Sequence, residues 1–315
     1  MTNRISFLMI AVLLLLGLTV QTRAQSVSLA MAQPEASASE LYACPMHGDV
    51  SSSKPGKCSK CGMELKAASA DIAEEFIVRT ETEPKRLQPG QKTTLRFTIF
   101  NPRTGEQVKA FNIQHEKPFH LFIVSSDLKH FDHIHPTQEP NGSFTIDTIL
   151  PQAGLYHVFC DIFPAGGIAQ VVHQNLVTDA FKANAESVQA RLQPEAETSK
   201  TVDGLRVEMK CAPEMLRSDQ PTLLRFQLTD TKTGQPITDL QPYLGAWGHT
   251  LILSEDAADY LHSHPINTQV QDAAPSTIYF ETYFPRPGKY KIWSQFQRNN
   301  KIITVSFTVA VANPN

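Results

Sequence analysis

Short runs in which apolar and polar residues alternate fill two long parts of the chain, residues 76–180 and 204–312. Examples are residues 95–100 and 120–124, and turn signals such as Asn141-Gly142 separate the runs. Alternation with a period of two predicts β-strands, and many short strands at this spacing are typical of a β-sandwich. We therefore predict a mainly β protein with two sandwich domains in tandem.

The two strand-rich parts are copies of each other. Leu95-Arg96-Phe97 aligns with Leu224-Arg225-Phe226. Later in each copy Tyr156 aligns with Tyr290, and the number of residues between these two is slightly larger than between the first two segments, which fits one loop insertion. The pattern indicates an internal repeat, with repeat 1 at 76–180 and repeat 2 at 204–312. The first of these separations also superposes three histidines of repeat 1 on three of repeat 2: His120, His133 and His135 on His249, His262 and His264.

Residues 1–24 have the pattern of an export signal. Arg4 precedes an unbroken apolar run at 7–16, and small residues end the segment at Ala24. The apolar run is shorter than the roughly 20 residues that a membrane-spanning helix needs, so we expect cleavage and no span in the mature protein. This predicts a periplasmic or secreted protein, in a compartment where thiols are either oxidised or protected by metal.

Two further segments lie between the predicted domains. Residues 25–40 are small and polar, which predicts a flexible tether. Residues 181–203 are rich in Ala, Glu and Gln, which predicts a linker with some helical content. The charges of the 315-residue chain nearly balance, with 28 Lys and Arg against 31 Asp and Glu, so we expect no nucleic-acid partner.

Cysteine is concentrated in one compact segment, residues 41–66, which we predict to be a metal-binding module. Cys44, His47, Cys58 and Cys61 lie close together in this segment. The two-residue gap between Cys58 and Cys61 lets one tight turn present both sulfurs to an ion, so the four side chains could fill a tetrahedral site. A segment of this size cannot bury a core, so a metal or a disulfide has to stabilise it. The alternative to a metal site is a disulfide between Cys58 and Cys61.

Residues 42–65 resemble the short heavy-metal-binding domain found on metal-efflux membrane-fusion proteins and copper-transporting P-type ATPases. The motifs that carry the resemblance are Cys-Pro-Met-His at 44–47 and Cys-Ser-Lys-Cys-Gly-Met at 58–63. The resemblance implies a soft or borderline ion, and ligand types alone do not separate copper from zinc. The implied ligands are three thiolates with an imidazole as the fourth, or thioethers if the ion is Cu(I): Cys44, Cys58, Cys61, His47, Met46 and Met63.

The repeated histidines are a second group with the chemistry of metal ligands. In repeat 1, His133 and His135 share one face of a strand, and a hairpin around residues 125–131 would place His120 opposite them. Three imidazoles could then converge on one ion. The same argument applies in repeat 2 to the equivalent triad, which consists of His249, His262 and His264. The alternative is a polar turn whose rings hydrogen-bond the backbone and which the duplication copied without a function.

The strand that contains Cys160 resembles the one that leads to the copper-binding cysteine of a cupredoxin. The resemblance covers residues 151–160, and it fits Ig/cupredoxin-like sandwiches. In cupredoxins a His and usually a Met follow that Cys closely, and residues 161–167 contain neither, so we expect no blue-copper centre. Cys160 is therefore expected to be a core residue. Met209 and Cys211, two residues apart, share one face of a strand, so we expect them in the core as well, and the alternative for them is a contact with copper.

The sequence lacks the motifs of several enzyme classes: a phosphate-binding glycine loop, a nucleophile elbow and a His-Glu-x-x-His helix. We therefore expect no enzyme but an exported protein that binds copper or zinc, and that sequesters the ion or passes it to a metal-efflux system or metallochaperone. One alternative is an envelope interaction protein with a structural metal clip. Another is a metalloenzyme that uses the His triad of repeat 1 with an open coordination position.

Overall fold

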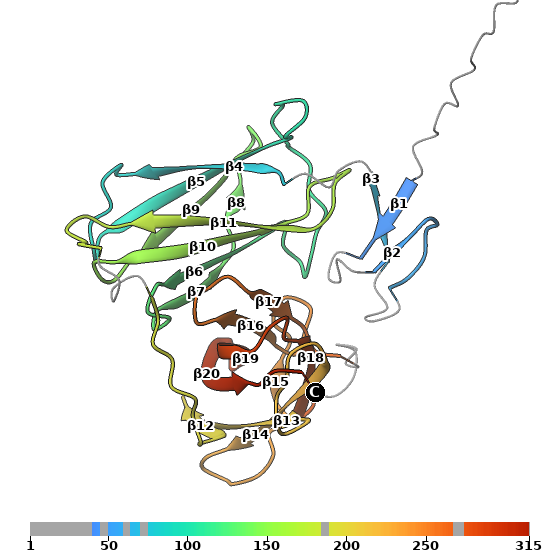
Figure 1. Cartoon of the computed structure of the whole chain (residues 1–315), viewed down its shortest axis with the longest axis vertical. Helices are drawn as coiled ribbons and strands as arrows, with labels where there is room; N and C mark the ends of the chain where they lie inside the picture. The colour runs from blue at the N-terminus through green and yellow to red at the C-terminus, as the bar shows by residue number, and fades with distance from the viewer. Residues whose placement is uncertain are drawn as a thin grey trace, which may run out of the picture. The chain divides into compact units, whose positions relative to one another are not determined.

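The structure is a computed structural model, and it describes residues 40–44, 50–58, 64–69, 75–183, 189–266 and 274–314. These residues form β-strands and no helix, and the strands pair antiparallel in five sheets (Figure 1). The mainly β class predicted from the alternation of apolar and polar positions is confirmed. The predicted export signal and all but the last residue of the predicted tether lie outside the described residues.

The cysteine-rich segment contains a small sheet of its own. Its strands are β1 (Glu40–Ala43), β2 (Ser51–Ser52) and β3 (Lys66–Ser69), in the order β2-β1-β3. Two cysteines and one leucine, Cys44, Cys58 and Leu65, form its buried cluster among the described residues. Such a core is too small to stabilise a fold by apolar burial, which agrees with the expectation of an additional stabilising bond or ion.

Repeat 1 is a sandwich of two four-stranded sheets. The first sheet has the order β4-β5-β9-β8, with β4 at Ile77–Glu83, β5 at Lys92–Phe100, β9 at Phe144–Ile149 and β8 at Thr137–Gln138. The second has the order β11-β10-β6-β7, with β11 at Gln170–Val177, β10 at Leu155–Ile162, β6 at Phe119–Ser125 and β7 at Phe131–Ile134. Alternate residues of the sheets, such as Phe97, Leu121 and Val158, fill the core between them.

Repeat 2 has the same topology, which confirms the duplication. Its first sheet has the order β12-β13-β14-β18, with β12 at Ser199–Val202, β13 at Leu205–Ala212, β14 at Pro221–Asp230 and β18 at Thr277–Tyr283. The second sheet contains β15 (Leu240–Gln241), β19 (Gly288–Arg298), β16 (His249–Ser254), β17 (Tyr260–Ser263) and β20 (Lys301–Val311). Strands β16, β17, β19 and β20 correspond to β6, β7, β10 and β11 at the separations read from the sequence.

Strands β6 and β16 are buried on both faces along almost their whole length, and their neighbours β10 and β19 are buried in the same way over part of theirs. In β5, buried and partly exposed residues alternate, whereas β6 is buried from Phe119 to Val124 and β16 from His249 to Ser254. One face of each strand lies in the core of its own repeat. The other face therefore has to be covered by something else, and a strand covered on both sides needs a nearly continuous apolar sequence.

The prediction for residues 181–203 was wrong in one respect. The described part of this segment contains no helix, and Ser199–Val202 is strand β12, which pairs with β13 of repeat 2. The residues of β12 are Ser-Lys-Thr-Val, of which Thr and Val favour strands, and pairing with the edge of a sheet satisfies their backbone groups. Repeat 2 accordingly begins before residue 204, the boundary expected from the sequence.

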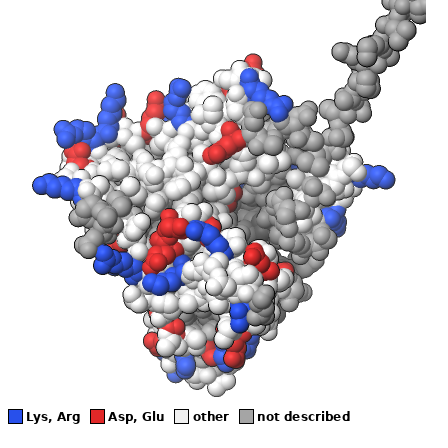
Figure 2. All heavy atoms as spheres, in the orientation of Figure 1, with Lys and Arg blue, Asp and Glu red and all other residues white. Residues whose placement is uncertain are grey.

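The exposed charges are mixed in sign. On the face seen in Figure 2, Lys and Arg alternate with Asp and Glu, and no large area of one sign is present among the described residues. This distribution agrees with the near-balance of charges in the sequence. Within the described part of the chain, no helix is long and apolar enough to cross a membrane.

Candidate metal centres

The two repeats pack against each other through the outer faces of their second sheets. Phe122 and Val124 of β6 contribute to a buried cluster that also contains Leu251, Leu253 and Trp293 of repeat 2. This cluster explains why β6 and β16 are buried on both faces. Each large apolar side chain that it removes from water contributes roughly 1.5–3 kcal/mol to the association of the repeats.

The packing has an approximate two-fold symmetry. Phe131 of repeat 1 stacks on Trp293 of repeat 2 with a centroid distance of 5.1 Å. The equivalent residue Tyr260 lies 5.0 Å from Phe159, which is the equivalent of Trp293. Equivalent residues therefore make reciprocal contacts, as in the interface of a symmetric dimer. The repeated histidines lie at the polar end of this interface, where equivalent residues of the two repeats also make reciprocal contacts.

The first histidine group consists of His120, His133 and His135, and we call it group 1. In the antiparallel pairing of β6 with β7, Phe122 lies opposite His133. The hairpin predicted around residues 125–131 therefore forms, and it brings His120 beside His133 and His135. The nitrogens that face each other are His120 Nδ1, His133 Nε2 and His135 Nε2, with separations of 3.1, 3.2 and 3.2 Å. Three nitrogens at about 2.0 Å from one tetrahedral ion would be about 3.3 Å apart. The geometry of group 1 is therefore that of a three-histidine site.

Hydrogen bonds at the far side of two rings decide which nitrogen carries the lone pair. His120 Nε2 lies 2.9 Å from the carbonyl oxygen of Gln114, and His133 Nδ1 lies 2.8 Å from Oε1 of Gln295. Because both oxygens accept, those nitrogens donate, and the opposite nitrogens present lone pairs to the centre of group 1. The half-buried His135 can donate its Nε2 proton to both, and a cation at the centre would replace that proton.

The second histidine group consists of His115, His249 and His264, and we call it group 2. One nitrogen of each ring lies within 4.8 Å of the others. His249 Nε2 donates to the carbonyl oxygen of Tyr243 at 2.9 Å, as His120 does to the equivalent Gln114. The opposite nitrogen of His249 and both ring nitrogens of His264 are buried and have no hydrogen-bond partner among the described residues. Because buried polar atoms normally have a partner, these nitrogens are placed as ligands of a cation would be.

His262, which the sequence predicts with His249 and His264, is not among the three residues whose nitrogens lie within 4.8 Å of one another. Its Nδ1 lies 2.9 Å from Oδ2 of Asp161 in repeat 1, which is the reciprocal of the contact between His133 and Gln295. A buried carboxylate needs donors, and it holds the ring towards the other repeat. Nε2 of His262 is buried without a partner in the described structure, and its ring centroid is 4.3 Å from that of His264.

Burial keeps these histidines neutral, which is the state that binds metal. Desolvation, followed by the nearby His262, lowers the pKa of His120 to about 4. Desolvation also lowers the pKa of His115 and of His135 to about 3. Burial likewise places the pKa of His133, His249 and His264 well below the usual range. Asp161 stays ionised, because hydrogen bonding to His262 lowers its pKa against the raising effect of burial.

Only part of the thiolate site predicted in the cysteine-rich segment is described. Cys44 and Cys58 are both buried and belong to one cluster with Leu65, so the structure brings two of the predicted ligands into the same small core. The other predicted ligands of this segment lie outside the described residues: Met46, His47, Cys61 and Met63.

The remaining histidines and cysteines of repeat 1 do not join either group. His157 Nδ1 lies 3.0 Å from His173 Nε2, and His130 pairs with Asp132. Cys160 is fully buried in the core of repeat 1, and burial raises the pKa of its thiol. Cys160 is thus the core residue that was expected.

The other sulfur residues considered in the sequence lie on β13 of repeat 2. Met209 belongs to the core of repeat 2, and Cys211 packs against that core from a half-buried position. Burial raises the pKa of Cys211 to about 11. The thiol is therefore protonated at neutral pH, and both residues have the core role that was expected.

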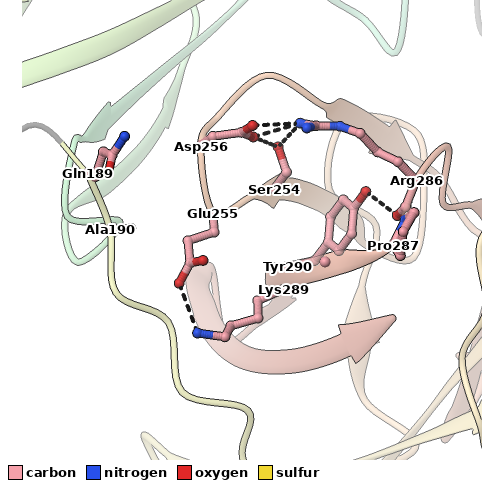
Figure 3. Close-up of a pocket in the computed structure, with 10 residues that line it drawn as sticks. Gln189, Ala190, Ser254, Glu255, Asp256, Arg286, Pro287, Lys289 and Tyr290 are labelled. Carbon is pink, nitrogen blue, oxygen red and sulfur yellow. Dashed lines mark hydrogen bonds and ion pairs between the residues drawn. The ribbon is translucent and has the colours of Figure 1, made fainter. Parts of the chain in front are cut away.

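A separate cavity in repeat 2, of about 260 Å³, offers no comparable chemistry. Its charged residues pair with one another: Arg286 contacts Asp256 at 2.7 Å, and Lys289 contacts Glu255 at 3.3 Å (Figure 3). The hydroxyl of Tyr290 donates to the carbonyl oxygen of Arg286. Since these groups already satisfy each other, the cavity is a structural feature rather than a candidate site.

Sequence reasoning missed His115, Asp161 and Gln295. His115 has no counterpart in the repeat, where Leu244 occupies its position, so the comparison of the copies did not select it. Asp161 and Gln295 occupy equivalent positions on β10 and β19, next to the buried His120 and His249. The continuous apolar runs of β6 and β16 were the one signal in the sequence for a second buried face.

Two family models match the chain. The model described as a domain of unknown function, DUF8832, matches residues 73–179 and again residues 200–313. The model described as a heavy metal binding domain matches residues 41–68. No curated protein matches the sequence.

Solved structures give only distant similarity. InvD of Yersinia pseudotuberculosis has 13% identity and a TM-score of 0.24, over 75% of this chain and 58% of that one. A putative membrane anchored protein from Corynebacterium diphtheriae has 10% identity and a TM-score of 0.23, over 81% of this chain and 62% of that one. The chain thus spans less than two thirds of either protein, and scores this low support no inference about function.

Proposed function

The chain belongs to the family described as a domain of unknown function (DUF8832), of which it has two copies behind a heavy metal binding domain, and we propose that it is an exported metal-binding protein of the cell envelope. The proposed ion is copper or zinc. In this proposal the protein sequesters the ion or passes it to an efflux system or metallochaperone, and it is not an enzyme.

One observation supports metal binding by the repeats as well as by the heavy metal binding domain. In group 1, three histidine nitrogens lie 3.1 to 3.2 Å apart, and two of them have their lone pairs directed inwards by hydrogen bonds to Gln114 and Gln295. A polar turn without a function could also bond His120 to a backbone carbonyl, but it gives no reason for three ring nitrogens to face one another at this spacing. The arrangement supports a cation site instead.

The two kinds of site suit different ions or different steps. Thiolates such as those of Cys44 and Cys58 favour soft ions including Cu(I), and imidazoles accept Cu(II) and Zn(II). A thiolate module at the amino-terminal side could capture an ion, and the histidine groups could hold it. The export signal predicted at residues 1–24 supports a location outside the reducing cytosol.

Metal stoichiometry of three variants of the full chain tests the proposal. We expect that replacing Cys44, Cys58 and Cys61 by Ser removes one class of bound ion, and that replacing His120 and His133 by Ala removes another. Replacing the half-buried Cys211 by Ser is the control and should leave the stoichiometry unchanged. The proposal fails if the freshly purified protein, equilibrated with Zn(II) or Cu(I), binds no ion tightly. It also fails if neither set of substitutions lowers the amount bound.

A structural metal clip and a metal carrier differ in how fast the bound ion exchanges with a competing chelator. For a carrier, a competing chelator should remove at least one bound ion within minutes, because a ligand-exchange route has to exist. A protein that keeps every bound ion for hours would instead be one in which the metal has a structural role.

A further inference from the structure

Groups 1 and 2 are related by the repeat, but one backbone position breaks their equivalence. Residues 114–117 and 243–246 form the same turn, closed by reciprocal backbone hydrogen bonds of 2.8 to 3.1 Å. The first residue of each turn holds the buried histidine through its carbonyl oxygen, at 2.9 Å in both repeats. The next residue has a positive φ in both, 42° at His115 and 50° at Leu244. The backbone is thus conserved in shape between the repeats, and the side chain at this position is not.

His115 crosses from repeat 1 into the histidine group of repeat 2. Its ring stacks on that of His264 with a centroid distance of 3.7 Å, and it lies 5.4 Å from the ring of His249. The ring of His115 is hydrogen-bonded to the backbone of Leu244, the residue that occupies the equivalent position of repeat 2. The ligands of group 2 therefore come from both repeats.

The two groups consequently differ in the number of nitrogens that can bind an ion. Group 2 has its three members, and His262 occupies the position that His133, a member of group 1, has in repeat 1; its ring centroid lies 4.3 Å from that of His264, and its Nε2 is buried without a partner in the described structure. This makes four nitrogens. Group 1 has three nitrogens, and the residue that would supply a fourth by symmetry is Leu244, which has no ligand atom. Four protein ligands close a tetrahedral site, whereas three leave one position open.

We infer that the interface between the repeats holds two ions of different lability, a permanent one in group 2 that joins the repeats and an exchangeable one in group 1. This inference rests on the proposed function, since it identifies group 1 as the site of the cargo. Exchange of a bound ion proceeds through an incoming ligand, and that ligand needs a free coordination position. Group 1 provides such a position, whereas four nitrogens fill a tetrahedral site in group 2.

A swap of the distinguishing residue tests the inference. The background is the full chain with Cys44, Cys58 and Cys61 replaced by Ser, so that the thiolate site is silent. Its histidine sites are loaded with Co(II), whose visible spectrum reports the coordination of each ion. The variants are His115→Leu, which copies repeat 2 into repeat 1, and Leu244→His, which does the reverse. Both side chains are compatible with a positive φ here, since each already occupies this backbone conformation in one repeat.

We expect the background protein to bind two Co(II) ions and to lose them to a chelator in a fast and a slow phase. His120→Ala should remove the fast phase. His115→Leu should accelerate the slow phase by about tenfold or more, and Leu244→His should slow the fast phase by a similar factor. Azide should change the spectrum of the labile ion only. His157→Ala, outside both groups, is the control and should leave both phases as they were.

Several outcomes would overturn the inference. They are binding of a single ion, equal release rates for both ions, or an unchanged slow phase in His115→Leu. In each of these cases the proposed function would stand, because metal is still bound. If the background protein binds no Co(II), the inference also falls, and the unsubstituted chain then shows separately whether the thiolate module binds metal.

Discussion

Removal of the Asp161 carboxylate should weaken the packing of the two repeats more than removal of the equivalent Gln295 amide. Asp161 is buried and accepts hydrogen bonds from two side chains of repeat 2, His262 at 2.9 Å and Tyr260 at 3.2 Å. Gln295 is equally buried, but it accepts one such bond from repeat 1, from His133 at 2.8 Å.

The expected magnitudes follow from counting the donors that each substitution leaves unsatisfied. A buried donor without an acceptor costs about 1–3 kcal/mol. Asp161→Ala leaves two donors without an acceptor, so we expect a loss of roughly 2–6 kcal/mol in the free energy of unfolding. Gln295→Ala leaves one buried donor, so we expect a loss of roughly 1–3 kcal/mol. The half-buried Thr304, which Gln295 also contacts, can be satisfied by water.

Urea unfolding of the metal-free full chain, followed by tryptophan fluorescence, measures both values. The chain has two tryptophans, and Trp293 lies in the cluster between the repeats, so its emission reports that interface. Asp147→Ala is the control, because Asp147 is an exposed partner of Lys92 and its removal should leave the urea midpoint almost unchanged. The reasoning is refuted if Asp161→Ala behaves like this control, or if Gln295→Ala destabilises more than Asp161→Ala.

Three further predictions concern the buried groups. The metal-free protein should keep its stability above about pH 6.5 and lose it as the pH falls towards 4, by about 1.4 kcal/mol per pH unit for each buried histidine. The sign follows from the lowered pKa of His120, about 4, and of His135, about 3: below pH 6.5 the unfolded chain binds protons that the folded state excludes. A flat profile of urea midpoints between pH 7.5 and 5 would contradict this. Cys160→Ser should cost about 1–3 kcal/mol and leave metal stoichiometry unchanged, because it buries a hydroxyl without a partner. In a double-mutant cycle Cys160→Ser should cost less when Leu121→Thr is also present, since the equivalent pair in repeat 2, Thr250 and Ser294, is hydrogen-bonded at 2.9 Å; strictly additive losses would count against the equivalence of the repeats.

The local features of the fold were accessible from sequence because they depend on residues that are neighbours along the chain. Period-two alternation predicted the strands, and the turn after Val124 predicted the hairpin that places His120 beside His133 and His135. The duplication was visible because the two copies retain the same core and turn residues at constant separations. The segment 181–203 shows the limit of this reasoning, since its overall composition indicated a linker although its last residues, Ser199–Val202, pair with β13.

The composition of the metal groups could not be predicted in the same way, because it depends on which faces of the two repeats meet. Comparing the copies placed His262 with His249 and His264, yet the ring of His262 turns to Asp161, far away along the chain. It also gave no reason to include His115, which reaches group 2 only across the interface. Strand alternation shows which residues share a face, whereas the partner of that face is chosen by shape and apolar area over the whole surface. Sequence patterns therefore located the histidines that can bind metal, and the packing of one repeat on the other decided which of them act together.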